Sequence, residues 1–102
     1  MQVISQITEY SPDILRNAAF QLRNATNRIV VLASVFDNKP NLVVAVSDDL
    51  LGRFEAPKIV RAVGKLIQGG GGGQPHFAQA GGKNADGLSA AVDKVLELAK
   101  LN

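Results

Sequence analysis

The sequence predicts an α/β (α+β) fold, in which a small mixed β-sheet with a central antiparallel hairpin is packed by three helices. Two β-branched, apolar runs, RIVVLASVF and LVVAVS, are separated only by a short turn segment, which is typical of a buried hairpin. Other segments repeat apolar residues at helical spacing. Hydrophobic residues make up 46% of the 102 residues, enough for the core of a single domain over residues 1–102.

The N-terminal part of the chain predicts a short strand over residues 2–7, followed by a helix. Ser11 is expected to cap this helix, Pro12 stands at its first position and Asp13 lies in its first turn. We expect the helix to end near residues 24–27. Its inward face is predicted from the apolar residues that recur at helical spacing, which are Ile14, Leu15, Ala18, Ala19 and Leu22.

The central hairpin is predicted from two apolar runs and the segment between them. Arg28–Phe36 is apolar on both faces, so we expect an interior strand covered by helices on two sides. The segment Asp37–Asn41, DNKPN, is rich in turn-forming residues, and Leu42–Ser47 is then a second strand antiparallel to the first. With the helix that follows, these strands predict a core of Val30, Val31, Leu32, Val43, Val44, Val46, Val60 and Val63.

A second helix is predicted from Pro57, in its first turn, to about Gln68. The connection before it spans residues 48–52, where the paired acids Asp48 and Asp49 are expected to cap the strand end and solvate the loop rather than to act in catalysis. The buried stripe of the helix is predicted as Ile59, Val60, Val63, Leu66 and Ile67.

The C-terminal part predicts a short strand over Phe77–Ala80 and a last helix that begins at Asn84 or Asp86. The inward residues of this helix are expected to be Leu88, Val92, Val95, Leu96 and Ala99. The element order therefore describes a mixed sheet with helices packed on it.

The segment QGGGGGQPHFAQAGGKN, Gln68–Asn84, holds seven of the ten glycines of the chain. Glycine loses the most backbone entropy when it is ordered, so such a run does not serve stability. We expect a loop at the end of the second helix, where glycine permits positive φ and successive N–H groups form a nest that binds an anion. A flexible linker is the alternative.

The positive charge of the chain is concentrated around this segment. The net charge of the whole chain is +2, whereas residues 53–83 hold five bases, Arg53, Lys58, Arg61, Lys65 and Lys83, against the single acid Glu55. Lys58, Arg61 and Lys65 stand at i, i+3 and i+7, which places them on one exposed helix face. A basic cluster beside a donor-rich loop indicates an anionic partner, and a solvated helix face is the alternative.

The continuation of the glycine run carries a family resemblance. The series GGGGG-x-P-x-x-A-Q-A-G-G resembles the signature of the DHHA1-type domain at the C-terminus of alanyl-tRNA synthetases. VVLASVFDNKPNLVVAVSDDL is similar to the central hairpin of that family, and APKIVRAVGKLI is similar to its helix before the glycines. The resemblance covers essentially the whole chain and implies a DHHA1-like fold.

The resemblance implies a tRNA-binding domain that holds the outer corner of the tRNA, supports aminoacylation and editing, and contributes to a homodimer. It places ATP and zinc in other domains of the parent synthetase, so no cofactor, metal or catalytic residue is expected here. Together with the charge pattern, it gives as the expected tRNA- and phosphate-binding residues Lys58, Arg61, Lys65, Gly69, Gly70, Gly71, Gly72, Gly73, Gln74, His76, Gln79, Gly81, Gly82 and Lys83.

Two positions depart from the family pattern. The family often has a basic residue in or just after the glycine run and an acid after the proline, where this chain has Gln74 and His76. The first change removes a phosphate contact and the second removes a repulsion. A protonated His76 would pair with phosphate at mildly acidic pH, and a hydrogen-bonding turn residue is the alternative.

An enzyme is a weak interpretation of this chain alone. It has one histidine and no cysteine, and the glycine run matches neither a Walker A loop nor a dinucleotide-binding GxGxxG motif. One alternative is the nucleotide- or nucleic-acid-binding domain of a DHH-family phosphoesterase or a stand-alone paralogue. Another is a plain dimerisation domain with incidental charge.

The sequence shows neither of the two segment types that direct a protein to a membrane or out of the cell, a membrane span and a signal peptide. No stretch approaches the roughly 20 apolar residues of a membrane span, and the start MQVISQITEY lacks the pattern of a signal peptide. A cytoplasmic location without membrane contact is therefore expected.

Overall fold

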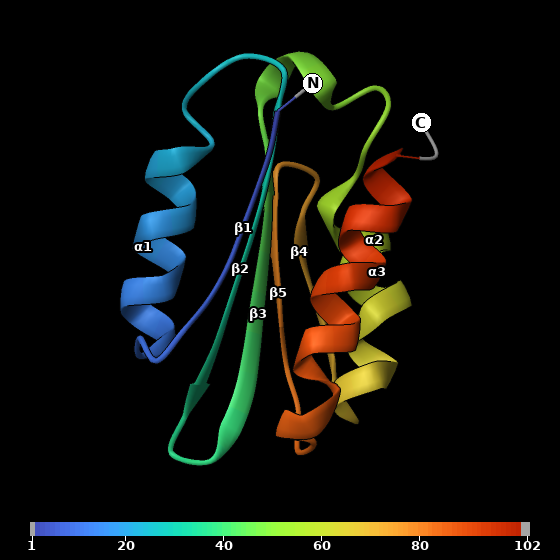
Figure 1. Cartoon of the computed structure of the whole chain (residues 1–102). Coiled ribbons are helices and arrows are strands. Elements are labelled where there is room, and N and C mark those ends of the chain that lie inside the picture. The colour runs from blue at the N-terminus through green and yellow to red at the C-terminus, as the bar shows by residue number, and fades with distance from the viewer. Residues whose placement is uncertain (1, 101–102) are drawn as a thin grey trace.

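A five-stranded β-sheet forms the centre of the computed structural model, which describes residues 2–100 (Figure 1). The strand order is β1-β2-β3-β5-β4, with β1 parallel to β2 and every other neighbouring pair antiparallel. The strands are β1 (Gln2–Thr8), β2 (Arg28–Phe36), β3 (Lys39–Val46), β4 (Gly70–Gln74) and β5 (Phe77–Gly81). The prediction of a mixed sheet around a central antiparallel hairpin is confirmed.

Helices cover both faces of this sheet (Figure 1). α1 (Pro12–Leu22) lies on one face, and α2 (Ala56–Gly64) and α3 (Leu88–Lys100) lie on the other. Short 3₁₀ turns precede or follow the last two helices, namely η1 (Asp48–Leu50), η2 (Lys65–Ile67) and η3 (Ala85–Gly87). The predicted packing of an interior strand by helices on two sides is confirmed.

The core has two layers because successive side chains of a strand point to opposite faces. In β2, Val30 and Leu32 pack under α1, whereas Ile29 and Val31 pack under α2 and α3. All eight valine and leucine residues predicted for the core are buried. The apolar runs therefore predict the core correctly.

The turn of the central hairpin is shorter than predicted. Only Asp37 and Asn38 form it, with φ of 52° and 63°, and β3 begins at Lys39 instead of Leu42. Two residues with positive φ make a tight hairpin turn whose twist matches that of the strands, and Asp and Asn tolerate this backbone well. Pro40 is consequently a buried strand residue rather than part of the turn.

The first helix begins as predicted and ends earlier. Pro12 is its first residue, but the Ser11 side chain makes no capping hydrogen bond, and the helix ends at Leu22. The prediction that Ile14 faces inward is wrong, because this side chain is 55% exposed. Ile14 lies at the margin of the apolar stripe, and among the described residues α1 is the only helix on its face of the sheet, so no second helix covers that flank.

The second and third helices are also shorter than predicted. α2 ends at Gly64 and continues as the 3₁₀ turn η2, and α3 begins only at Leu88. The prediction that Leu66 is buried is wrong, because it is 39% exposed. A 3₁₀ turn advances by about 120° per residue instead of about 100°, so the buried stripe of α2 does not continue in phase.

The glycine run forms a strand, which corrects the prediction of a loop. Gly70–Gln74 is β4, an edge strand paired with β5. The left-handed residue that follows η2 is Gln68, with φ of 54°, and within the run only Gly73 has a positive φ. A run of glycines has no side-chain periodicity, so the sequence contains no strand pattern at this place.

Candidate nucleic-acid interface

The glycine strand lies directly beside α2 along the length of that helix. At one end Gly69 donates its N–H to the carbonyl of Gly64 at 3.0 Å, and at the other end Ala56 donates its N–H to the carbonyl of Pro75 at 2.9 Å. These contacts tie the glycine segment to the C-terminal end of α2 and the β4–β5 turn to its N-terminal end. The outer edge of β4 is therefore next to the helix that carries the basic residues (Figure 1).

The basic row, which we define as Lys58, Arg61 and Lys65, is fully on the surface. All three side chains are exposed, as their helical spacing predicts, although Lys65 already belongs to η2. Lys58 forms an ion pair with Glu55 at 3.3 Å. A charge row thus runs parallel to the glycine strand.

Lys83 joins this surface at the C-terminal end of the row. Its backbone N–H donates to the carbonyl of Ile67 at 2.9 Å, and the Lys83 side chain is exposed. Gly82 allows this contact, because a Cβ atom at that position would lie 2.1 Å from the same carbonyl oxygen. The structure therefore brings Lys83 to the end of η2, the turn that contains Lys65.

The glycines of the run fall into two groups. A Cβ atom at Gly69, Gly71 or Gly73 would come within 1.9 to 2.4 Å of backbone oxygen atoms in β5, so packing requires glycine there. A Cβ atom at Gly70 or Gly72 would meet nothing within 4 Å. Packing gives no reason for glycine at these two positions.

The unexplained glycines share one face with Gln79 and Gly81. Gly72 pairs with Gln79, and Gly70 pairs with Gly81. This face is opposite to the one on which Ala78 and Ala80 are buried under α2 and α3. The surface there is made largely of backbone, and Gly72 can be approached closely from outside.

The predicted site residues are consequently divided by the edge of the sheet. The basic row and Lys83 belong to the α2 side, whereas Gln79 and Gly81 face the α1 side. Two residues that the sequence did not indicate lie beside the latter pair: Arg16 donates to the Gln79 side chain at 3.4 Å, and Asn41 pairs with Gly81. They come from distant segments, and no local pattern in the sequence indicates their position.

The two departures from the family pattern lie at the β4–β5 turn. Gln74 is exposed at the end of β4, and His76 is half-buried. The carbonyl of His76 accepts the N–H of Val46 at 2.9 Å, so its backbone holds the turn against β3. The turn is at the N-terminal end of α2, the end that carries Lys58.

The carboxylates of Asp48 and Asp49 both contact other segments of the chain. Asp48 forms an ion pair with Arg23, and both carboxylate oxygens of Asp49 accept the N–H of Asn27, at 3.0 and 2.8 Å. The hydrogen bond from Asn27 holds the pKa of Asp49 below its ordinary value, with a further contribution from the Ser47 side chain. These acids therefore contact the end of α1 and the residue before β2, rather than capping the end of β3 as predicted.

The described residues, 2–100, contain neither a cluster of metal-binding side chains nor a helix able to span a membrane. Over this range, no three histidine or acidic side chains are grouped so that they could hold a metal ion. None of the described helices combines the length and hydrophobicity needed to cross a membrane. The exposed side-chain cations of the basic row and of Lys83 are groups that can bind anions.

Comparisons with known proteins agree with these features. The family model described as the DHHA1 domain matches residues 1–101. The chain is 52% identical over 102 residues to an alanine–tRNA ligase of Bacteroides fragilis, and 51% identical over 102 residues to that of Bacteroides thetaiotaomicron. Each match covers 97% of this chain and 12% of the relative, so the chain spans about an eighth of their length.

A solved structure gives the same result. The crystal structure of the C-Ala domain from Aquifex aeolicus alanyl-tRNA synthetase superimposes with a TM-score of 0.86 at 36% sequence identity. The match covers 93% of this chain and 87% of that one. The comparisons therefore do not favour the alternative of a DHH-family phosphoesterase, and the chain belongs to the DHHA1 domain family, in the form that occurs as the C-Ala domain of alanyl-tRNA synthetases.

Proposed function

We propose that this chain binds tRNA along the edge formed by the basic row and the glycine strand. The observation that carries the proposal is that Lys58, Arg61 and Lys65 are exposed beside an edge strand of which two residues, Gly70 and Gly72, have open space in place of a side chain. The family relationship to alanine–tRNA ligases makes tRNA the expected anionic partner.

The contacts are proposed to be with the RNA backbone. Exposed lysine and arginine side chains neutralise phosphates without selecting a base sequence. Gly70 and Gly72 are open on the α1 side of β4, so a ribose–phosphate chain that passes around this edge of the sheet can approach their backbone more closely than a strand with side chains would allow. Recognition by this edge therefore depends on the shape of the tRNA, and Gln74, His76, Gln79, Gly81 and Lys83 extend the contact surface.

In the parent protein this domain is proposed to serve alanine–tRNA ligase as a C-terminal tRNA-binding part. It would hold the outer corner of the tRNA while other domains, which would carry the ATP and zinc sites, perform aminoacylation and editing. The domain itself would need no cofactor and have no catalytic activity. A cytoplasmic location and a contribution to a homodimer belong to the same proposal.

A charge-removal experiment tests the binding surface. Arg61→Ala should weaken the binding of several structured tRNAs by a similar factor, and should make the log–log dependence of affinity on salt shallower by about one unit, because one phosphate contact is lost. Lys100→Ala removes one charge from the exposed last residue of α3, which is not part of the predicted site, and serves as the control. Equal effects of both variants, or none from Arg61→Ala, would contradict the proposed surface.

A further inference from the structure

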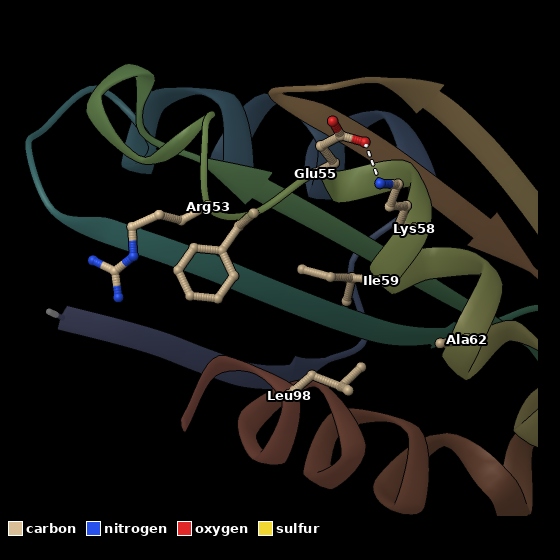
Figure 2. Close-up of a pocket in the computed structure, with 7 residues that line it drawn as sticks. Arg53, Glu55, Lys58, Ile59, Ala62 and Leu98 are labelled. Atoms are coloured by element: carbon tan, nitrogen blue, oxygen red, sulfur yellow. Dashed lines mark ion pairs between the residues drawn. The ribbon is translucent and has the colours of Figure 1, made fainter. Parts of the chain in front are cut away.

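An apolar pocket lies between α2 and α3, and Lys58, the first residue of the basic row, belongs to its lining (Figure 2). It has a volume of about 270 Å³ and lies between the segment before α2, α2 itself and α3. Of the residues predicted for tRNA binding, only Lys58 belongs to its lining. The lining consists of Arg53, Phe54, Glu55, Lys58, Ile59, Ala62 and Leu98.

The inner part of the pocket is apolar, and its mouth is accessible. Phe54 and Ile59 are only 4% and 7% exposed and form the inner wall. Ala62 is exposed and Leu98 is half-buried. Figure 2 shows Leu98 reaching from α3 toward the side of α2 that carries Ile59 and Ala62. An apolar group that enters from solvent would therefore exchange water for aliphatic carbon on two sides.

The pocket also offers a flat cationic group. The Arg53 guanidinium lies over the Phe54 ring, 5.5 Å from its centre. Guanidinium groups and aromatic rings are the usual surfaces on which proteins stack a nucleobase. A planar heterocycle is accordingly a better match to this lining than an aliphatic chain.

The charge around the mouth points to an anionic carrier of that heterocycle. Within the lining, the acid Glu55 forms an ion pair with Lys58. Arg61 adjoins Ala62 in the sequence and adds another exposed cation next to the pocket. The volume is below the roughly 300–1,000 Å³ of sites that enclose a whole drug-sized ligand, which leaves room for a single ring system.

We propose that this pocket receives one unstacked nucleobase of the bound RNA, while the phosphates that flank this nucleotide lie on Lys58 and Arg61. The inference rests on the proposed tRNA binding and adds to it a contact with a base. Lys58 belongs both to the basic row and to the pocket, so a nucleotide chain that follows the row passes the mouth. An aromatic or aliphatic side chain of a partner protein would fill the same space but would bring no negative charge to the exposed Arg61 next to it.

A pocket-filling variant tests this inference. Ala62→Phe should fill the pocket from its exposed side and weaken tRNA binding by about fivefold or more, the value of one lost stacking contact. The salt dependence should remain that of the wild type, since no phosphate contact is removed. Asn17→Phe, on an exposed position of α1 across the sheet, adds a phenylalanine elsewhere and should leave the affinity within twofold.

A spectroscopic measurement supplies a direct readout. When tRNA is added to the wild-type chain, ring currents of the inserted base should shift the methyl resonances of Ile59 and Leu98. The exposed Ile14 methyl groups on α1 should not shift. Thermal unfolding of each variant confirms that the fold is intact.

The outcomes separate this inference from the proposed function. If Arg61→Ala weakens binding but Ala62→Phe stays within twofold of the wild type, the base pocket is wrong and the tRNA-binding edge stands. If the wild type binds no tRNA, both are wrong. Equal losses in Ala62→Phe and Asn17→Phe would also overturn the pocket. So would intact tRNA binding by Ala62→Phe together with a lost association with the rest of the ligase, which would assign the pocket to a protein side chain.

Discussion

A carbon atom added to Gly71 in the Cβ direction would lie 1.9 Å from the carbonyl oxygen of Gln79, so the backbones of β4 and β5 are in direct contact at this point. The next residue, Gly72, would meet nothing within 4 Å. Neighbouring glycines of one run therefore have different roles. The first is required by the fold, and the second is available to a ligand.

The first prediction concerns the stability of the glycine strand. Gly71→Ala should lower the free energy of unfolding by more than about 2 kcal/mol, because the methyl group can be accommodated only if the two strands separate. Gly70→Ala, at a position with open space, should change it by no more than a few tenths of a kcal/mol or stabilise the fold slightly. Chemical denaturation of both variants measures the difference, and similar values would show that the close contact is absent.

The second prediction concerns the central strand. Val44 is fully buried in β3 under α2 and α3. Val44→Ala should lower the free energy of unfolding by about 1–3 kcal/mol, because transfer energy is lost and a cavity remains. Urea unfolding would detect this directly. A loss of only a few tenths would show that the strand is not packed as described.

The hairpin and its core could be predicted because each buried position of the two strands is occupied by an apolar residue that can be recognised in the sequence. Val43 and Val44 point to opposite faces, and both are buried, so the unbroken apolar run indicates a strand covered on two sides. Helix faces could be predicted only in part. The exposure of Ile14 and Leu66 depends on where neighbouring elements end, which helical spacing does not reveal.

The glycine strand could not be predicted, for a different physical reason. Its position is set by backbone contacts such as that of Gly71 with Gln79, and these contacts leave no side-chain pattern in the sequence. The exposed basic row could be predicted, because Lys58 and Arg61 lie on α2 and Lys65 lies in the η2 turn that directly continues it. The pocket next to it could not, since Phe54 and Leu98 are far apart in the sequence and line one space only because α3 packs against α2.

The third prediction concerns pH. The lowered pKa of Asp49 means that the folded state favours its charged form. This contribution to stability is fully present above the pKa of an unfolded aspartate, about 4, and is lost as the pH falls through the lower folded value. Asp49→Asn should therefore be less stable than the wild type at pH 7, and the difference should shrink below pH 4.

Urea unfolding at several pH values measures this difference. Asp93→Asn, at an exposed position of α3, serves as the control for removing an acid. A deficit in Asp49→Asn that is unchanged down to pH 3 would show that the hydrogen bond from Asn27 does not depend on the charge of the carboxylate.

The last prediction concerns the open glycine. The φ angle of Gly72 is not positive, so its backbone suits any residue. A side chain at this position would project into open space. Valine favours strands, so Gly72→Val should leave the free energy of unfolding unchanged or slightly higher. Its two methyl groups would nevertheless keep an RNA backbone away from β4, and tRNA binding should weaken by about tenfold without a change in the salt dependence, since no charge is removed.

Ser5→Val places the same side chain on β1, the opposite edge strand, and should leave binding intact. Titration of labelled tRNA against both variants decides the matter: if Gly72→Val binds as tightly as Ser5→Val, the bare strand does not contact the RNA, and binding then depends on the basic row alone.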